Sequence, residues 1–334
     1  MDAVTISACK TSELSTRGHI GMPRYGILFF AIAAALSTDL SAQLAAWQPE
    51  PGHLTIPLWP GAAPGAKPNP PAEMGTFTEK NSGIAGKPVL IESNISTPSI
   101  TLYSPKPDDS GAKNSHSAIV VFPGGGYNIL AIDLEGTEVC RWLNSVGLTC
   151  VLLKYRVPQS GPYPKLPAAL QDAQRALGIV RYHAAEWHID PNRIGVLGFS
   201  AGGHLAVAIS NHFEQRLYDP VDGADDLSCR PDFAVLVYPA YLTIDDHDFA
   251  AIPELRPTAN TPRTFIVQTE DDPVHVENAL VYYRELKDAK VPAELHIYAQ
   301  GGHGYGLRRA ALPVTTWPAS VETWLRTIKV LPPN

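Results

Sequence analysis

The sequence predicts an α/β fold built on a mainly parallel sheet, with helices on both faces and no large cap domain. From Ser117 onward, short apolar runs alternate with longer helical segments, a pattern typical of parallel strands joined by crossover helices. One of these strands leads through a tight turn directly into a helix of small and apolar residues. The irregular segments 214–230 and 243–262 are too short to form a large lid.

The composition is that of an ordinary globular protein. The chain has 334 residues, of which 45% are hydrophobic and 18% are charged, enough for one large domain or two small ones. The net charge is −7, so the chain lacks the basic footprint of a nucleic-acid-binding protein. We therefore expect no nucleic acid among its partners.

The N-terminus has the features of a secretory signal peptide. Arg24 precedes the short apolar run 26–36, and small residues follow, so that cleavage is expected after Ala42. Because the stretch before Met22 is long and polar for a leader, we hypothesise that translation starts at Met22. An uncleaved anchor is the alternative, but the apolar run is shorter than a usual membrane span. We expect residues 1–42 to be removed, leaving a secreted or periplasmic protein without a stable membrane anchor.

Loss of this leader leaves three cysteines, Cys140, Cys150 and Cys229. An odd number permits at most one internal disulfide. Their spacing matches no metal site, so no metal is expected. Buried free thiols are the favoured interpretation.

Residues 43–116 are expected to form an N-terminal extension that is part of the same domain as the core. The run 53–59 predicts a short edge strand, and the Pro- and Gly-rich segment 60–85 predicts a surface loop. The runs 89–92 and 99–103, separated by turn residues, predict an antiparallel pair at a sheet edge.

The core is expected to span residues 117–334. Its apolar runs predict six strands, at 118–122, 148–155, 194–197, 233–238, 264–268 and 293–298. Between and after them, apolar residues at three- and four-residue spacing or small-residue runs predict five helices, at 136–146, 167–187, 201–213, 276–287 and 318–329.

The segment Gly198-Phe-Ser-Ala-Gly202 fits the pattern G-x-S-x-G between a predicted strand and a predicted helix. This context indicates a nucleophile elbow with Ser200 at its tip. Glycines are needed two residues either side of the serine because the turn leaves no room for a Cβ atom. The serine itself is expected in a strained backbone conformation, and the helix N-terminus behind it favours negative charge.

An elbow serine needs a base and an orienting acid, which follow it along the chain in this architecture. His303 is the predicted base, because it lies in a glycine-rich loop directly after the last predicted strand. Asp272 is the predicted acid, since it follows the preceding strand and is itself followed by an apolar turn. Asp271 is the close rival, with a structural role in binding backbone amides as its alternative. The cluster Asp245, Asp246 and Asp248 is a third option, interpreted as a solvated loop.

A run of three glycines at 124–126 directly follows the predicted strand 118–122. Glycines there leave backbone N–H groups able to approach a carbonyl oxygen. We therefore predict an oxyanion hole from the amides of Gly125 and Gly126, joined by the amide of Ala201.

Several side chains belong to loops that should gather above the sheet. Tyr127, Tyr163, Tyr238 and Tyr241 are candidates for the pocket, as is Glu135. Each of these residues is individually more typical of packing than of substrate contact. His204, on the elbow helix, is expected to support the turn.

With these pieces in place, the chain resembles the α/β-hydrolase superfamily. The resemblance is to serine esterases, in particular hormone-sensitive-lipase-like carboxylesterases and bacterial acetyl xylan and feruloyl esterases. It runs from about residue 56 to the C-terminus and rests on the glycine run, the segment 167–206 with the elbow, Glu270-Asp-Asp-Pro-Val274 and Gly301-Gly-His-Gly-Tyr-Gly306. One departure is Pro123, where these esterases usually carry a histidine that braces the loop.

The resemblance implies a secreted serine esterase that removes acetyl or other small acyl groups from plant-type polysaccharides. The variant glycine loop, the leader and the lack of a long cap are similar to the polysaccharide-deacetylating branch rather than to lipases. The implied partner is a small-molecule or polysaccharide ester, and no metal or organic cofactor is implied.

Other functions are compatible with this fold. A general short-chain carboxylesterase would use the same residues. A peptidase of the prolyl-oligopeptidase type shares the triad, but it normally carries a propeller domain, for which the residues before Ser117 are too few. A non-catalytic binding protein on the same fold would be indicated by loss of a triad residue, and none is lost here.

Overall fold

The computed structural model describes residues 44–78, 84–105, 114–159, 161, 163, 165, 167–244 and 248–333. The expected leader, including Met22 and the cleavage position, lies outside the described residues. So do Asp245 and Asp246 of the acidic cluster.

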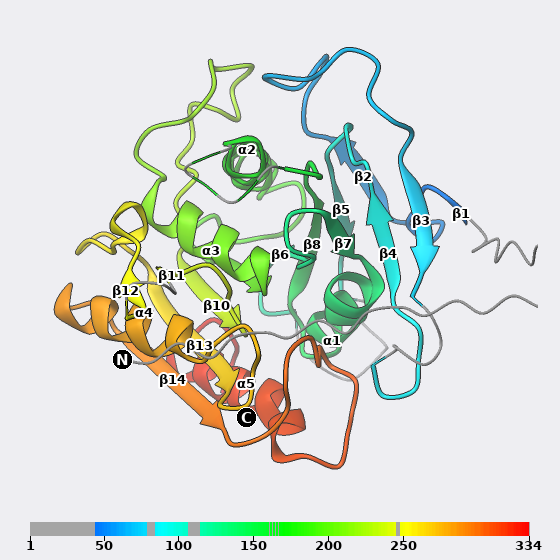
Figure 1. Cartoon of the computed structure of the whole chain (residues 1–334). Coiled ribbons are helices and arrows are strands. Elements are labelled where there is room, and N and C mark those ends of the chain that lie inside the picture. The colour runs from blue at the N-terminus through cyan, green and yellow to red at the C-terminus, as the bar shows by residue number, and fades with distance from the viewer. Residues whose placement is uncertain are drawn as a thin grey trace, which may run out of the picture. The chain divides into compact units, whose positions relative to one another are not determined.

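The centre of the described unit is an eight-stranded sheet (Figure 1). Six neighbouring strands at one side of it are parallel, and the two strands at the other edge are joined to them by antiparallel pairing. The prediction of a mainly parallel sheet is therefore confirmed. In sheet order the strands are β14 (Ala293–Tyr298), β13 (Arg263–Thr269), β10 (Phe233–Val237), β9 (Ile194–Phe199), β6 (Ala118–Phe122), β8 (Thr149–Lys154), β5 (Ser99–Tyr103) and β2 (Leu54–Pro57).

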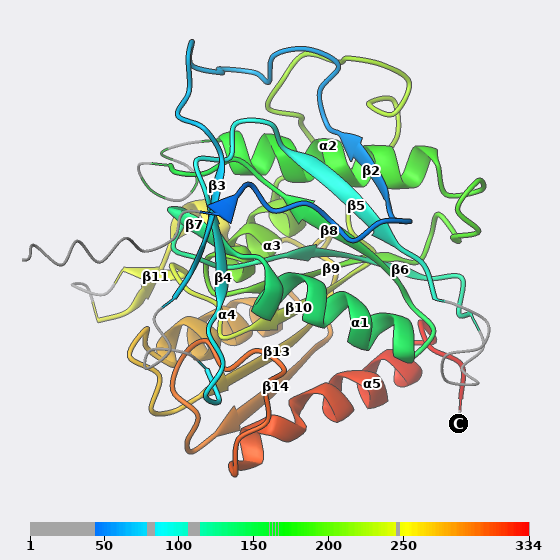
Figure 2. The ribbon, with the colours of Figure 1, turned by 90° about the vertical axis from the view of Figure 1, so that its right-hand side faces the viewer.

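Helices cover both faces of this sheet, as predicted. Along β6, alternate residues enter two different apolar clusters, because successive side chains of a strand point to opposite faces. Ala118, Val120 and Phe122 join the helices α2 (Ala168–Tyr182), α3 (Ala201–Asn211) and α4 (Glu277–Asp288). Ile119 and Val121 join α1 (Glu138–Ser145) and α5 (Trp317–Thr327). Figure 2 shows α2 on one side of the sheet and α1 with α5 on the other.

Burial explains why the central strands are mostly apolar. Every residue of β6, β8, β9 and β10 is buried. A strand covered by helices on both faces has no solvent side, so alternation with polar residues disappears.

A second, four-stranded antiparallel sheet corrects two predictions. It consists of β1 (Leu44–Ala45), β3 (Met74–Phe77), β4 (Leu90–Ser93) and β7 (Ile129–Ala131). The predicted pairing of 89–92 with 99–103 is wrong, because β4 pairs with β3 and β7, whereas β5 pairs with β2 and β8. The predicted loop 60–85 is wrong in part, because it contains β3.

The helix predicted at 136–146 has a different beginning. A π-helical turn, η2 (Asp133–Thr137), comes first and leads directly into α1. The remaining short elements are β11 (Thr243–Ile244), β12 (Ala250–Ala251), η3 (Pro253–Leu255) and η4 (Pro313–Thr316). No helix in the described part of the chain has both the length and the apolar character needed to cross a membrane.

The prediction that the cysteines are free thiols is wrong for two of the three residues. Cys140 in α1 and Cys150 in β8 form a disulfide, with their Cα atoms 5.1 Å apart. Helix α1 packs across β8, which brings these two residues within disulfide distance. Cys229 is buried and free, as expected.

Candidate active site

Ser200 stands between the end of β9 and the start of α3, in the tight turn that the sequence predicts. Its backbone angles are φ 51° and ψ −118°, a conformation that L-residues rarely adopt and that marks strain at functional sites. A Cβ atom at Gly198 would lie 2.0 Å from the carbonyl oxygen of Gly202. One at Gly202 would lie 2.1 Å from the carbonyl oxygen of Phe122. The turn therefore requires glycine at both positions.

Three predicted site residues are brought together in a chain of hydrogen bonds. The Nε2 atom of His303 lies 2.8 Å from the Oγ atom of Ser200. The Nδ1 atom of His303 lies 3.0 and 2.9 Å from the two carboxylate oxygens of Asp272. When Nδ1 carries the proton and donates it to the carboxylate, Nε2 is left as an acceptor for the serine hydroxyl.

The carboxylate of Asp272 is buried and held in place by its own neighbours. Oδ1 accepts a hydrogen bond from the amide of Val274 at 2.7 Å, and Oδ2 accepts one from the Nε2 atom of Gln268 at 3.1 Å. These bonds orient both oxygens independently of His303. The carboxylate that faces His303 is therefore fixed in position.

Asp271, the rival acid, faces a different way. Its carboxylate is exposed and accepts hydrogen bonds from the amides of Gly301, at 3.0 Å, and Gly302, at 2.8 Å. These bonds, the one from Gly302 foremost, lower the pKa of Asp271. Asp271 thus binds the backbone of the loop that carries His303, and it does not bind the His303 side chain. Asp248, the described member of the third option, is exposed.

The glycine run lies directly beside the serine. A Cβ atom at Gly124 would be 2.9 Å from the Cβ atom of Ser200. Gly125 and Gly126 have φ values of +136° and +62°, conformations that favour glycine. Among the described residues, no acceptor is hydrogen-bonded to the amide of Gly125 or Gly126. The amide of Ala201 is the first of α3 and has no acceptor within the helix. All three N–H groups of the predicted oxyanion hole are therefore available.

Glu135 links this glycine run to the histidine loop. Its buried carboxylate accepts hydrogen bonds from the amide of Gly124 at 2.6 Å and from the hydroxyl of Tyr238 at 2.8 Å. Burial raises the pKa of Glu135, and these two hydrogen bonds oppose the rise. The Tyr238 hydroxyl in turn accepts a hydrogen bond from the amide of Gly306 at 3.1 Å. The sequence marks Glu135 only as a pocket candidate, because a lone glutamate has no spacing signal.

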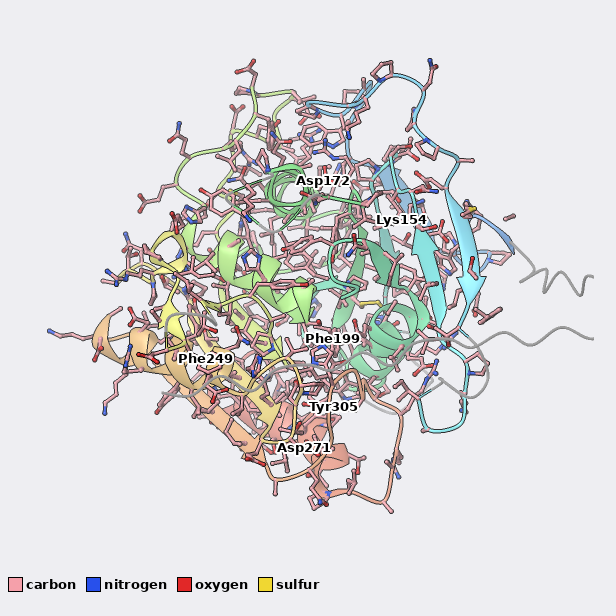
Figure 3. All side chains as sticks on the ribbon, viewed as in Figure 1. Lys154, Asp172, Phe199, Phe249, Asp271 and Tyr305 are labelled. Carbon is pink, nitrogen blue, oxygen red and sulfur yellow. A yellow bond between two sulfur atoms is a disulfide. The ribbon has the colours of Figure 1, made fainter. Side chains whose placement is uncertain are left out.

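The pocket tyrosines have different environments. Tyr238 is fully buried, and its ring centroid lies 4.9 Å from that of His303. It also packs between Phe199 and Tyr305, at 5.6 and 4.5 Å (Figure 3 labels the latter two). Tyr163 is half-buried and packs its ring on His212, 4.7 Å away. The buried ring of Tyr238 therefore packs against the ring of His303.

Tyr127 and Tyr241 lie at the glycine run with their rings stacked 6.4 Å apart. Tyr127 is buried and its hydroxyl is 2.8 Å from the Nδ1 atom of His204. Burial lowers the pKa of His204 to about 3, so its ring is neutral at neutral pH. Tyr241 is 40% exposed, and its hydroxyl lies 3.6 Å from the position of a Cβ atom at Gly126. Of these four tyrosines, Tyr241 is the one exposed beside the predicted oxyanion hole.

Within the described ranges, no three His, Cys, Asp or Glu side chains are grouped so that they could hold a metal ion.

The fold and the site together define a class of protein. A serine at a strand-to-helix elbow, with a histidine and an aspartate in line from later loops, is the arrangement of hydrolases that use a serine nucleophile. A family model for the alpha/beta hydrolase fold matches residues 119–253. The crystal structure of an acetyl ester-xyloside bifunctional hydrolase from Caldicellulosiruptor lactoaceticus is 34% identical, with a TM-score of 0.63, over 86% of this chain and 98% of that chain. The chain belongs to the α/β-hydrolase family.

Curated relatives refine this assignment. An acetylxylan esterase of Xylanibacter ruminicola is 33% identical over 217 residues, which is 58% of this chain and 42% of the relative. An endo-1,4-beta-xylanase B of Butyrivibrio fibrisolvens is 30% identical over 206 residues, 56% of this chain and 32% of the relative. The chain thus spans less than half the length of these two relatives. The resemblance to esterases of the acetylxylan esterase type is confirmed.

Proposed function

We propose that this protein is a secreted serine esterase that hydrolyses acetyl and other small acyl esters of plant polysaccharides. The observation that carries the proposal is the hydrogen-bonded chain from Ser200 through His303 to Asp272 at the elbow. The names of the relatives, an acetylxylan esterase and an acetyl ester-xyloside hydrolase, support the choice of substrate.

In this mechanism Ser200 Oγ attacks the ester carbonyl carbon while His303 accepts the serine proton. The amides of Gly125, Gly126 and Ala201 stabilise the oxyanion of the tetrahedral intermediate. His303 then protonates the oxygen of the leaving alcohol, and the acyl group stays on the serine. Water, deprotonated by His303, hydrolyses this acyl-enzyme and releases the carboxylic acid. Asp272 holds the histidine tautomer throughout.

The preference for small acyl groups is supported by the segments that would form a lid. In the described part of 243–262 there are only the short elements β11, β12 and η3. The segment 214–230 is held against α2, because Arg175 of α2 binds Asp222 and Asp225. In the residues that the structure describes, neither segment provides an extended apolar cover for a long acyl chain.

Export is supported by the disulfide between Cys140 and Cys150. Disulfides persist in oxidising compartments such as the periplasm and the extracellular space. This agrees with the expected signal peptide over residues 1–42. Secretion is accordingly part of the proposal.

The test compares the purified protein with its Ser200→Ala variant. Both are given 4-nitrophenyl acetate, 4-nitrophenyl octanoate, methyl ferulate and acetylated xylan. We expect the parent to release acetate from xylan and to favour the acetate over the octanoate ester. The variant should lose at least about three orders of magnitude in kcat, because the nucleophile is gone.

The other outcomes identify the competing functions. Turnover of the nitrophenyl esters without release of acetate from xylan would indicate a general short-chain carboxylesterase. A prolyl peptide is added as a fifth substrate, and its cleavage by the parent would indicate a peptidase. Binding of xylan with no turnover by either protein would indicate a binding protein on the same fold.

A further inference from the structure

A recess of about 420 Å³ lies away from the residues of the candidate active site. It is bounded by the second sheet (Phe77 of β3 and Leu90 of β4), by the end of β5 (Tyr103), and by α1 (Arg141 and Asn144). Its volume falls within the range of small-molecule binding sites in proteins. None of Ser200, His303, Asp272 or the glycine run lines it.

Four aromatic side chains from different segments line the recess. Trp47, His53, Phe77 and Tyr103 all line it. The rings of His53 and Tyr103 lie against each other with their centroids 4.0 Å apart. Phe77 is 53% exposed, so its side chain is accessible to an apolar ligand surface. Single exposed aromatic residues need no explanation, but four rings around one recess provide a binding platform.

Polar groups complete the recess with both signs of charge. Glu50 and Arg141 pair at 3.1 Å, with side chains that are 74% and 62% exposed. Burial, with a further contribution from the nearby Glu50, raises the pKa of Tyr103 to about 12, so its hydroxyl remains a hydrogen-bond donor at neutral pH. A carboxylate, a guanidinium and a hydroxyl thus lie beside the aromatic side chains, and Asp133 adds a second carboxylate to the lining.

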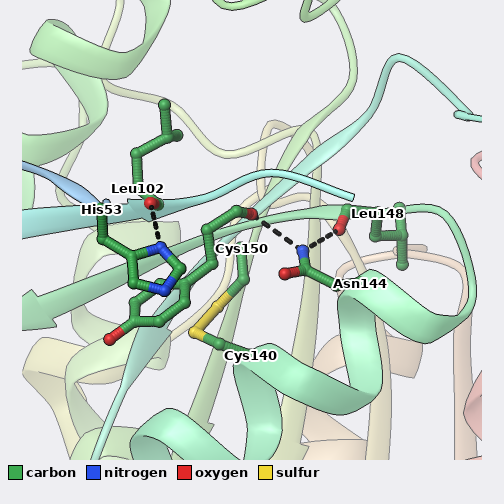
Figure 4. The surroundings of a disulfide bond; sticks show 7 residues. His53, Leu102, Cys140, Asn144, Leu148 and Cys150 are labelled. Atoms are coloured by element: carbon green, nitrogen blue, oxygen red, sulfur yellow. Dashed lines mark hydrogen bonds between the residues drawn. A yellow bond between two sulfur atoms is a disulfide. The ribbon is translucent and has the colours of Figure 1, made fainter. Parts of the chain in front are cut away.

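The walls of the recess are tied together. The disulfide joins Cys140 of α1 to Cys150 of β8, and Cys150 pairs with Tyr103 across the sheet (Figure 4). Asn144 of α1 donates hydrogen bonds to the carbonyl oxygens of Tyr103, at 2.8 Å, and Leu148, at 2.9 Å. The nearby His53 bonds the carbonyl of Leu102 at 3.2 Å. A site built on such fixed elements loses little conformational entropy when it binds.

We propose that this recess is a carbohydrate-binding subsite that holds unsubstituted sugar units of the polysaccharide whose esters Ser200 hydrolyses; this rests on the proposed function. A pyranose presents C–H groups on its faces, which pack on aromatic rings, and hydroxyls at its edge, which bond to carboxylate, guanidinium and hydroxyl groups. Acyl chains are disfavoured by the charged pair of Glu50 and Arg141.

The recess and the ester site share one turn. Asp133 and Thr137 of η2 line the recess. Glu135, between them in the same turn, binds the amide of Gly124 beside Ser200. The recess therefore lies on the other side of η2 from the glycine run, and a polymer bound there has to pass this turn to reach Ser200.

The first test measures binding of xylohexaose, which carries no ester, to the Ser200→Ala protein by isothermal titration calorimetry. Phe77→Ala and Arg141→Ala are added separately to this background. Their matched controls are Tyr182→Ala, a tyrosine that is 57% exposed on α2, and Arg284→Ala on α4. We expect each recess variant to weaken binding about tenfold, the loss of one good contact, and each control to bind as the parent does.

The second test uses the active protein with the same four substitutions. The ratio of kcat/KM on acetylated xylan to kcat/KM on 4-nitrophenyl acetate should fall in the recess variants and stay constant in the controls. Absence of xylohexaose binding, or equal binding by all variants, would overturn the recess proposal even if xylan is deacetylated. Binding that depends on Phe77 and Arg141, without release of acetate from xylan, would keep the subsite and reject the proposed ester function.

Discussion

The neighbouring carboxylates of Asp271 and Asp272 have different partners, which leads to a prediction for each. Asp272→Asn should lower kcat by about 10³–10⁴, because an amide at this position favours the wrong histidine tautomer. Asp271→Asn is the matched control. It keeps one oxygen acceptor for the amides of Gly301 and Gly302, so its kcat should change by less than about tenfold. Steady-state kinetics on 4-nitrophenyl acetate measure both.

If kcat falls more in the Asp271 variant than in the Asp272 variant, then Asp271 orients His303 and the prediction is wrong. Circular dichroism of both variants checks that neither substitution has unfolded the protein. Equal small losses in the two variants would mean that the histidine is oriented without a carboxylate.

Glu135 is a positioning residue in this site. In Glu135→Gln, one of the two acceptors that face Gly124 and Tyr238 becomes an N–H₂ group. The glycine run should shift, and kcat should fall about 10–100-fold with little change in KM, because the oxyanion donors act mainly in the transition state. Affinity for a boronic acid, which forms a tetrahedral adduct on the serine oxygen, should fall by a similar factor.

The matched control for this prediction is Glu138→Gln on α1, whose carboxylate binds Arg308 instead. A purely structural role of Glu135 would lower the melting temperature while leaving kcat and boronic acid affinity of the folded fraction intact. That result would contradict the positioning role.

For single residues, the sequence predicts a role where that role depends on the neighbouring residues in the chain. Ser200 lies in a five-residue pattern, and His303 lies among glycines after a strand. The disulfide between Cys140 and Cys150 depends on how a helix packs across a strand, which spacing along the chain does not encode. The link from Glu135 to Tyr238 spans 103 residues and is equally hidden.

Helix α2 holds the irregular segment 214–230 in place through a buried arginine. Arg175 donates hydrogen bonds to Asp222 at 2.7 Å and to Asp225 at 3.0 Å. The hydrogen bond from Arg175, foremost, lowers the pKa of Asp222 to about 2. An Asp whose pKa is lower in the folded than in the unfolded chain stabilises the fold above its ordinary pKa, and this stability is lost as the pH falls.

The pH dependence of stability should therefore change in Asp222→Asn. We expect the free energy of unfolding to fall less steeply between about pH 4 and about pH 2 than in the parent protein, since the variant has no proton to take up there. The effect is small, because the Asp222 side chain is 53% exposed and water screens the pair. Urea denaturation at several pH values measures it.

Asp226→Asn provides the control, because Asp226 is exposed in the same segment. It should leave the slope of stability with pH as in the parent. A slope that is unchanged in both variants would mean that the pair between Arg175 and Asp222 does not persist in solution.

The sequence predicts the parallel elements well and the antiparallel ones poorly, for a physical reason. Strands such as β6 and β9 are continuously buried, so they appear as apolar runs between helices. The second sheet uses β3, with a glycine in it, and β7, which has only three residues. Such short strands are formed by their tertiary partners, and no periodic pattern marks them.

In the described unit as a whole, the two sheets support different parts of the candidate active site. The large sheet carries the elbow, the predicted acid and the predicted base at the ends of β9, β13 and β14. The second sheet, through β7, holds the segment between the glycine run and η2. The amides predicted to stabilise the oxyanion are thus supported by a different sheet from the one that carries Ser200.

The last prediction concerns the whole chain and its compartment. If residues 1–42 are a signal peptide, a bacterial host with an intact export pathway should release a protein whose N-terminus is Gln43. In the oxidising compartment Cys140 and Cys150 should be paired. Denatured without reductant, the exported protein should then react with one equivalent of a thiol reagent, at Cys229. After reduction it should react with three, because Cys9 is removed with the leader. N-terminal sequencing that finds residues before 43 on the exported protein would contradict cleavage, and three reactive thiols before reduction would contradict export through an oxidising compartment.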